Sequence, residues 1–146
     1  MRELVLDVIS AIVDDDTDVA FVRGLVTRRL ATDQEDEIRL ATVAVLRGLL
    51  RHGWIAMATF TTGRGYLPWS AQGDLAADRI DREWRDLRGS PSIADIGYVR
   101  LTPAGEVRFR VDLAEFEARG PAAEPPDQEL PLRSWLDLAG RSVYRL

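Results

Sequence analysis

The sequence predicts an α+β domain with three N-terminal helices, a small antiparallel sheet, and a fourth helix inserted into the sheet region. Apolar residues recur at helical spacing in three successive segments before Gly53. The short apolar run 54–60 follows this glycine and is typical of a buried strand. A further helical segment, 70–88, separates that strand from residues 106–113, whose apolar and polar side chains alternate as in a strand.

The first two helices are predicted over 3–13 and about 18–30. Three residues form the main apolar stripe of the first: Leu4, Val8 and Ile12. Between the helices lies an acidic segment, in which we expect Asp16 or Thr17 to cap the second helix. Their side-chain oxygens can accept hydrogen bonds from first-turn amides, which have no partner within the helix.

The third helix is predicted to begin at a capping box, with Thr32 as the cap and Glu35 three residues later. It runs to about residue 51, and Gly53 is expected as the first residue beyond its C-terminal cap. The strand 54–60 follows, and residues 61–65 form a turn.

The fourth helix, 70–88, has one apolar line and one charged side. The apolar line consists of Ala76, Ile80, Trp84 and Leu87. On the charged side, the i,i+4 pairs Asp78–Arg82 and Asp81–Arg85 are expected to face solvent.

The last part of the domain is predicted as a β-hairpin. Thr102 to Gly105 fit a type I turn with proline in second position, and residues 106–113 then form its second strand. The domain is expected to cover residues 1–119. A proline-rich linker, 120–131, and a C-terminal docking tail, 132–146, follow it.

Two motifs in this order resemble the winged helix-turn-helix superfamily, as in MarR-type and PadR-type bacterial regulators. They are Leu46-x-x-Leu49-Leu50-x-x-Gly53-x-Ile55 and Leu101-Thr102-x-x-Gly105, and the resemblance covers residues 1–60 and 97–113. It implies a third helix that enters the DNA major groove, with a wing beside it. The chain departs from the pattern by a whole helix inserted into the wing and by the strand-like run after the second motif.

The charges favour protein contact over DNA contact. The net charge is −5, and the third helix begins with acidic residues where a DNA reader places basic or neutral polar groups. We therefore predict a non-enzymatic regulatory or adaptor protein that binds another protein. The alternative is a DNA-binding transcriptional regulator, whose nucleic-acid contacts would come from Arg39, Arg64, Arg100, Arg108 and Arg110.

No constellation for catalysis, metal or cofactor binding is evident. The chain has no cysteine and a single histidine, so we expect neither an enzyme nor a bound cofactor. Trp69 is predicted as an exposed anchor for a protein partner, together with Trp135 and Leu136 in the tail. The tail could dock on its own domain, on a second copy to form a homodimer, or on another protein. We expect no membrane segment and a cytoplasmic location.

Overall fold

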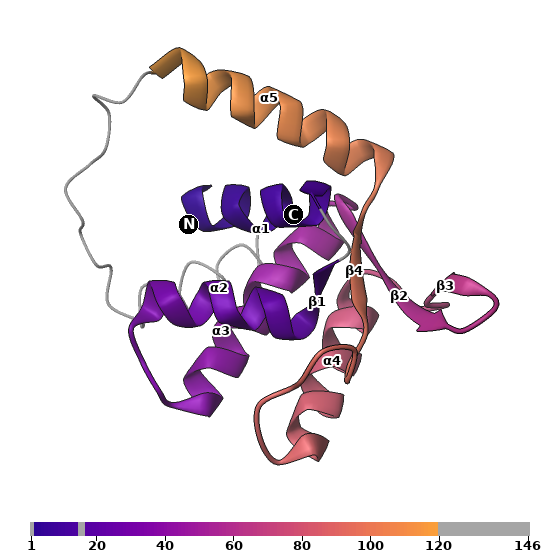
Figure 1. Cartoon of the computed structure of the whole chain (residues 1–146). Helices are drawn as coiled ribbons and strands as arrows, with labels where there is room; N and C mark the ends of the chain where they lie inside the picture. The colour runs from indigo at the N-terminus through magenta and orange to yellow at the C-terminus, as the bar shows by residue number, and fades with distance from the viewer. Residues whose placement is uncertain (1, 15–16, 120–146) are drawn as a thin grey trace.

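The computed structural model describes residues 2–14 and 17–119, which form five helices and a four-stranded antiparallel sheet (Figure 1). The predicted α+β class is confirmed. The predicted linker, 120–131, and tail, 132–146, lie outside the described residues. In chain order the elements are α1 (Arg2–Asp14), β1 (Thr17–Asp18), α2 (Val19–Leu30), α3 (Glu35–Arg51), β2 (Ile55–Thr61), β3 (Gly65–Pro68), α4 (Asp74–Leu87), β4 (Tyr98–Leu101) and α5 (Pro103–Arg119).

The sheet has the strand order β1-β4-β2-β3, so β4 joins the first strand to the β2–β3 hairpin. Val99 of β4 lies opposite Thr17 of β1 on one side and opposite Met57 of β2 on the other. Strand β2 confirms the predicted apolar strand, but the sequence analysis missed β1 and β3. Strand β1 is only two residues long and β3 contains glycine and proline, so neither shows the alternation that identifies a strand.

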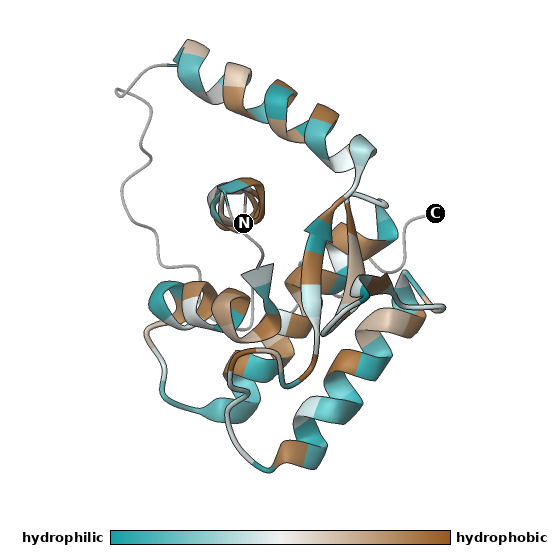
Figure 2. Ribbon diagram, turned by 45° about the vertical axis from the view of Figure 1, so that its right-hand side comes forward, coloured by the Kyte–Doolittle hydropathy of each residue, from teal (hydrophilic) through white to brown (hydrophobic). Residues whose placement is uncertain are grey.

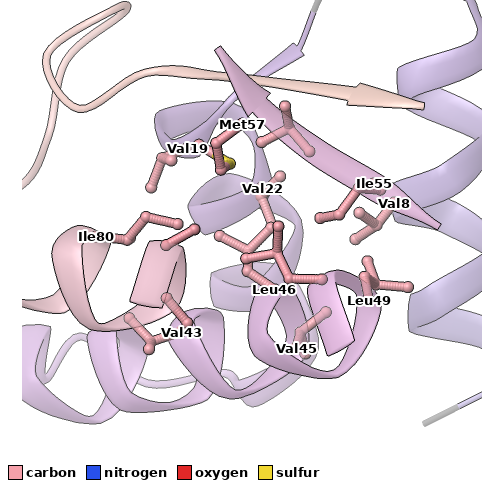
Figure 3. Close-up of a cluster of buried hydrophobic side chains, with 14 of the residues drawn as sticks. Val8, Val19, Val22, Val43, Val45, Leu46, Leu49, Ile55, Met57 and Ile80 are labelled. Carbon is pink, nitrogen blue, oxygen red and sulfur yellow. The ribbon is translucent and has the colours of Figure 1, made fainter. Parts of the chain in front are cut away.

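One hydrophobic core holds the N-terminal helices, the sheet and the inserted helix together (Figure 3). Val8 of α1, Val22 of α2 and Leu46 of α3 are fully buried in it. Met57 of β2 and Ile80 of α4 are buried to the same extent. Full burial of one such side chain contributes about 1.5–3 kcal/mol. The segment between β2 and β4 is therefore an integral part of this domain.

The predicted strand over 106–113 is wrong, because these residues belong to the long helix α5. The predicted type I turn is the first turn of that helix. Thr102 caps it, since its Oγ1 accepts a hydrogen bond from the amide of Gly105 at 3.1 Å. Pro103 occupies the first helical position, where proline is favoured. The i,i+4 ion pair Arg108–Asp112 adds support within the helix. These local signals outweigh the alternation of apolar residues.

The two quoted motifs meet in space at the start of α5. The backbone amide of Thr102 donates to the carbonyl of Trp54 at 3.0 Å, and the Thr102 hydroxyl donates to the carbonyl of Gly53. A Cβ atom on Gly105 would lie only 2.0 Å from the Trp54 carbonyl oxygen. Glycine is therefore required at 105, because it lets α5 approach the turn that joins α3 to β2.

Two of the predicted helix caps are wrong by a few residues. Asp18 caps α2, in place of Asp16 or Thr17, and its Oδ1 accepts from the amide of Phe21 at 2.8 Å. Helix α3 begins at Glu35 without a side-chain cap, so Thr32 and Glu35 do not form the predicted capping box. Glu35 instead forms an ion pair with Arg23 of α2, and this contact takes the place of the expected capping box. Gly53 has the predicted left-handed backbone beyond α3, with a φ of +67°.

No helix within the described part of the chain is both long enough and apolar enough to cross a membrane.

Candidate functional site

Helix α4 lies along α3 and pairs with its arginines (Figure 1). The Arg47 Nη2 lies 2.6 Å from the Oδ1 of Asp78. Both Arg51 and Arg47 contact Asp74, and the Arg51 Nε is 2.5 Å from its Oδ1. Each contact joins a cation of α3 to a carboxylate of α4, so α4 neutralises this face of α3.

Arg39 completes the pairing between the two helices. It forms an ion pair with Asp81 of α4, and its side chain is only 12% exposed. Arg39 also lies 3.6 Å from Asp36 in the first turn of its own helix. The guanidinium that sequence analysis assigned to nucleic acid is therefore enclosed between carboxylates.

The acids of α4 do not all face solvent as predicted. Asp81 forms the predicted pair with Arg85, at 2.9 Å. Asp78 pairs with Arg47 of α3, however, and not with Arg82. The hydrogen bond from Arg51, followed by the one from Arg47, holds the pKa of Asp74 below its usual value. Asp74 therefore stays ionised at neutral pH.

Glu35 connects α2, α3 and α4 at the other end of this face. It accepts two hydrogen bonds from Arg23, at 2.6 and 3.1 Å. Its Oε1 also accepts from the indole Nε1 of the buried Trp84, and its Oε2 accepts from the hydroxyl of Ser90. The Arg23 hydrogen bond is the main cause that lowers the pKa of Glu35. The acidic start of α3 thus has a structural use inside the protein.

Arg64 and Arg100 lie on the hairpin and the sheet, away from the contact between α3 and α4. Arg64 occupies the exposed turn between β2 and β3. The Arg100 guanidinium lies 4.4 Å from the ring centroid of Tyr66. This ring also packs edge-on against Phe60 and Tyr98. Strands β2, β3 and β4 carry no acidic residue, so this surface is locally basic in an acidic protein.

Arg108 and Arg110 both belong to α5 and have different surroundings. Arg108 forms two hydrogen bonds with Asp112, at 2.6 and 2.9 Å, and lies 5.4 Å from the ring of Trp54. Arg110 lines a surface hollow together with Arg100. Of the five predicted arginines, the structure brings Arg100 and Arg110 together, and it leaves Arg39 in a different interface.

The hollow lies where the C-terminal end of α1 and the N-terminal half of α5 meet β4, and its volume is about 570 Å³. Its polar wall consists of Arg100, Glu106 and Arg110, and its apolar wall consists of Ile12, Val13, Val99, Leu101 and Phe109. On α5 itself, Val107 is 62% exposed and Val111 is 45% exposed. Figure 2 shows hydrophobic and hydrophilic residues interspersed along this helix.

The predicted exposure of Trp69 is wrong, because this side chain is 6% exposed. Its indole Nε1 donates to the hydroxyl of Thr59 at 2.9 Å, and the Arg79 guanidinium lies 3.8 Å from its ring. The tryptophan side chain packs between β2 and α4, so it is not available as an anchor for a partner. The other two predicted anchors, Trp135 and Leu136, lie outside the described residues.

Sequence analysis missed most of the residues that form the interface between α3 and α4. Arg47, Arg51 and Asp74 were not selected, although all three pair across the interface. The available signal was their spacing. Arg47 and Arg51 are four residues apart on α3, and Asp74 and Asp78 are four residues apart on α4. Each pair therefore lies on one face of its helix.

Among the described residues, no group of three or more histidine, cysteine, aspartate or glutamate side chains is arranged to hold a metal ion. In comparisons with known proteins, no family model, no curated protein and no solved structure matched this chain.

Proposed function

We propose that this chain is a non-enzymatic, cytoplasmic regulatory or adaptor protein with a winged-helix-like fold, and that it acts by binding another protein. Three features support the fold. Strand β1 stands between α1 and α2 and pairs with β4. Strand β4 pairs with β2, which follows α3. The two motifs meet at Gly105. Strand β3 and α4 then occupy the place where a winged helix has its short wing loop.

The observation that carries the proposal is the pairing of the α3 arginines with α4. A helix that reads the major groove uses its cations for phosphates and base edges. Here Arg39, Arg47 and Arg51 each contact an α4 carboxylate. Helix α4 also carries more acids than arginines, with Asp74, Asp78, Asp81, Glu83 and Asp86 against Arg79, Arg82 and Arg85. Duplex DNA would meet carboxylates at this face.

The surface of helix α5 has features that favour contact with a protein. Val107 and Val111 are exposed one helical turn apart, and the hollow that α5 borders has both apolar and charged lining residues. Contiguous apolar surface with a polar rim is typical of a protein-binding site. We therefore assign the surface formed by α1, β4 and α5 as the partner-binding surface.

Site-specific photo-cross-linking in cells of the source organism tests this assignment. A photoreactive residue at Val107 is expected to cross-link a discrete foreign protein. The same residue at Leu87 of α4, which is 43% exposed, serves as the matched control and is expected to give no such product. Cross-linking of the same protein from both positions, or of none from Val107, contradicts the assignment.

DNA binding remains the second candidate because of the basic sheet surface. Arg64 and Arg100 are both exposed, the Arg100 guanidinium lies over the ring of Tyr66, and the surrounding strands carry no acid. Such a surface could contact phosphates without using α3. If this candidate is correct, the double variant Arg64→Ala/Arg100→Ala weakens salt-dependent binding to duplex DNA. A wild-type protein without such binding removes the candidate.

A further inference from the structure

The hollow has an apolar wall that is available to an occupant. Val13 of α1 is 48% exposed at its edge, and Phe109 of α5 is only partly buried. A volume of about 570 Å³ is in the range of sites that enclose large apolar groups. Removing such a surface from water is favourable, so an apolar segment would bind there.

We propose that residues 132–146 of the same chain bind in this hollow, with Trp135 and Leu136 as the anchors. The segment then covers the partner-binding surface and competes with the partner protein. This inference deepens the proposed function, on which its regulatory meaning rests, whereas the binding itself is tested separately below.

The length of the chain beyond α5 permits this binding within one molecule. Helix α5 ends at Arg119, and Phe109 lies ten residues earlier, about 15 Å along the helix. The intervening segment 120–131 can span up to about 40 Å when extended. A tether of this length gives its attached segment an effective concentration in the millimolar range. Binding to the same molecule is therefore favoured over binding to a second copy.

The composition of the segment suits a hollow with one apolar wall. Large apolar residues recur through it: Leu132, Trp135, Leu136, Leu138, Val143, Tyr144 and Leu146. The first three stand at positions i, i+3 and i+4, which is the spacing of anchors that fill a groove from one helix face. A peptide of this length is marginal as an isolated helix in water, so binding to the domain would stabilise it.

The charges at the edge of the hollow have counterparts in the segment. Arg100, Arg110 and Glu106 line the hollow. Within the described part of the chain, none of them forms an ion pair. Asp137 directly follows the Leu136 anchor and can face the two arginines, while Arg133 can face Glu106. These pairings match the polar rim that surrounds an apolar docking site.

Disulfide trapping in the full-length chain tests the proposal, because the natural sequence has no cysteine to interfere. The double variant Val13→Cys/Ser134→Cys places one thiol at the hollow and one beside Trp135. The control Leu87→Cys/Ser134→Cys places the first thiol on α4, which lies far from α5 in Figures 1 and 2. Under mild oxidation at low protein concentration, we expect the first pair to form an intramolecular disulfide about tenfold faster than the control.

Adding Trp135→Ala to the first pair is expected to reduce its rate to that of the control. Equal rates in the two pairs, or a rate that does not change with Trp135→Ala, overturn the proposal. A disulfide that joins position 13 of one chain to position 134 of another also overturns it, because the occupant of the hollow would then come from a second copy. Failure of this test leaves foreign-protein cross-linking at Val107 intact, and failure of that cross-linking leaves the disulfide intact.

Discussion

The two sides of this domain use their charged and apolar residues in opposite ways. On the side formed by α3 and α4, the cations Arg39, Arg47 and Arg51 are paired with acids of the neighbouring helix. On the side formed by α1, β4 and α5, Arg100 and Arg110 stand beside a hollow with an apolar wall. The first side is an internal interface that has become part of the fold. The second side is the one to which we assign partner binding.

We therefore assign binding to the surface whose apolar side chains are exposed, and not to the surface whose arginines form ion pairs within the domain. Resemblance to a winged helix directs attention to α3, where a DNA reader has its contacts. Once α4 packs there, an α3 arginine serves the protein's own stability. The following predictions test the two sides, starting with the largest expected effect.

Gly105→Ala is expected to lower the free energy of unfolding by about 3 kcal/mol, because the new methyl group would meet the Trp54 carbonyl at 2.0 Å. The matched control is Gly48→Ala, near the C-terminal end of α3. A Cβ there meets no atom within 4 Å, so this change should be neutral or stabilising by up to about 1 kcal/mol. Urea denaturation of both variants measures the difference. Equal effects would show that α5 does not depend on this close approach.

Glu35→Ala is expected to cost about 2 kcal/mol, because the change leaves Arg23 and the buried Trp84 indole without their acceptor. Asp36→Ala is the control, since the Asp36 side chain is 91% exposed and contacts only the edge of Arg39 at 3.6 Å. Its effect should stay within about 0.5 kcal/mol. A Glu35→Ala variant as stable as the control would contradict the structural use of the acidic helix start.

Acid is expected to weaken the interface between α3 and α4. Folding lowers the pKa values of Asp74 and Glu35, so at acidic pH the unfolded chain binds more protons than the folded one. The stabilisation is therefore complete above the ordinary carboxyl pKa of about 4 and is lost as pH falls below it. Urea denaturation between pH 7 and pH 3 should show this loss. Asp74→Asn should flatten the curve, and an unchanged acid limb in that variant would refute its role.

Val107→Ser/Val111→Ser is expected to change the stability by no more than about 0.5 kcal/mol, because both valines are exposed on α5. The same variant should lose the capture of a foreign protein by a photoreactive group at Ala114, which is exposed two turns beyond Val107 on the same face of α5. A loss of stability above about 2 kcal/mol would show that the domain itself needs these side chains. In that case the comparison between the two sides would fail.

The sequence was sufficient for features that are determined locally. The periodicity of α1, α2 and α4, the apolar strand β2 and the glycine after α3 are all readable from neighbouring residues. Strands β1 and β3 could not be read, because each depends on a partner distant in the chain. Helix α5 was mistaken for a strand, because alternation was given more weight than the Thr102 cap and Pro103.

The candidate site was harder to predict because it depends on contacts between elements. No local pattern indicates that Asp81 pairs with Arg39, forty-two residues away. Trp69 follows Pro68 in a segment expected to be a loop, which predicted exposure, but Thr59 and Arg79 contact it in the structure. Charge composition was nevertheless informative. The acidic start of α3 favoured protein contact over DNA contact, which stays a prediction, and the structure shows that Glu35 there accepts hydrogen bonds from Arg23 and Trp84.

The most direct test is a titration with mixed-sequence duplex DNA at low and at physiological salt. It asks whether the ion pairs with α4 prevent the arginines of α3 from binding DNA. The wild-type protein is compared with Asp74→Asn/Asp78→Asn/Asp81→Asn, which releases the three α3 arginines and keeps the size of each side chain. We expect no binding by the wild type at either salt concentration, and weak binding by the variant that disappears as salt rises. Micromolar binding by the wild type that weakens steeply with salt and is lost in Arg39→Ala/Arg47→Ala would contradict the account.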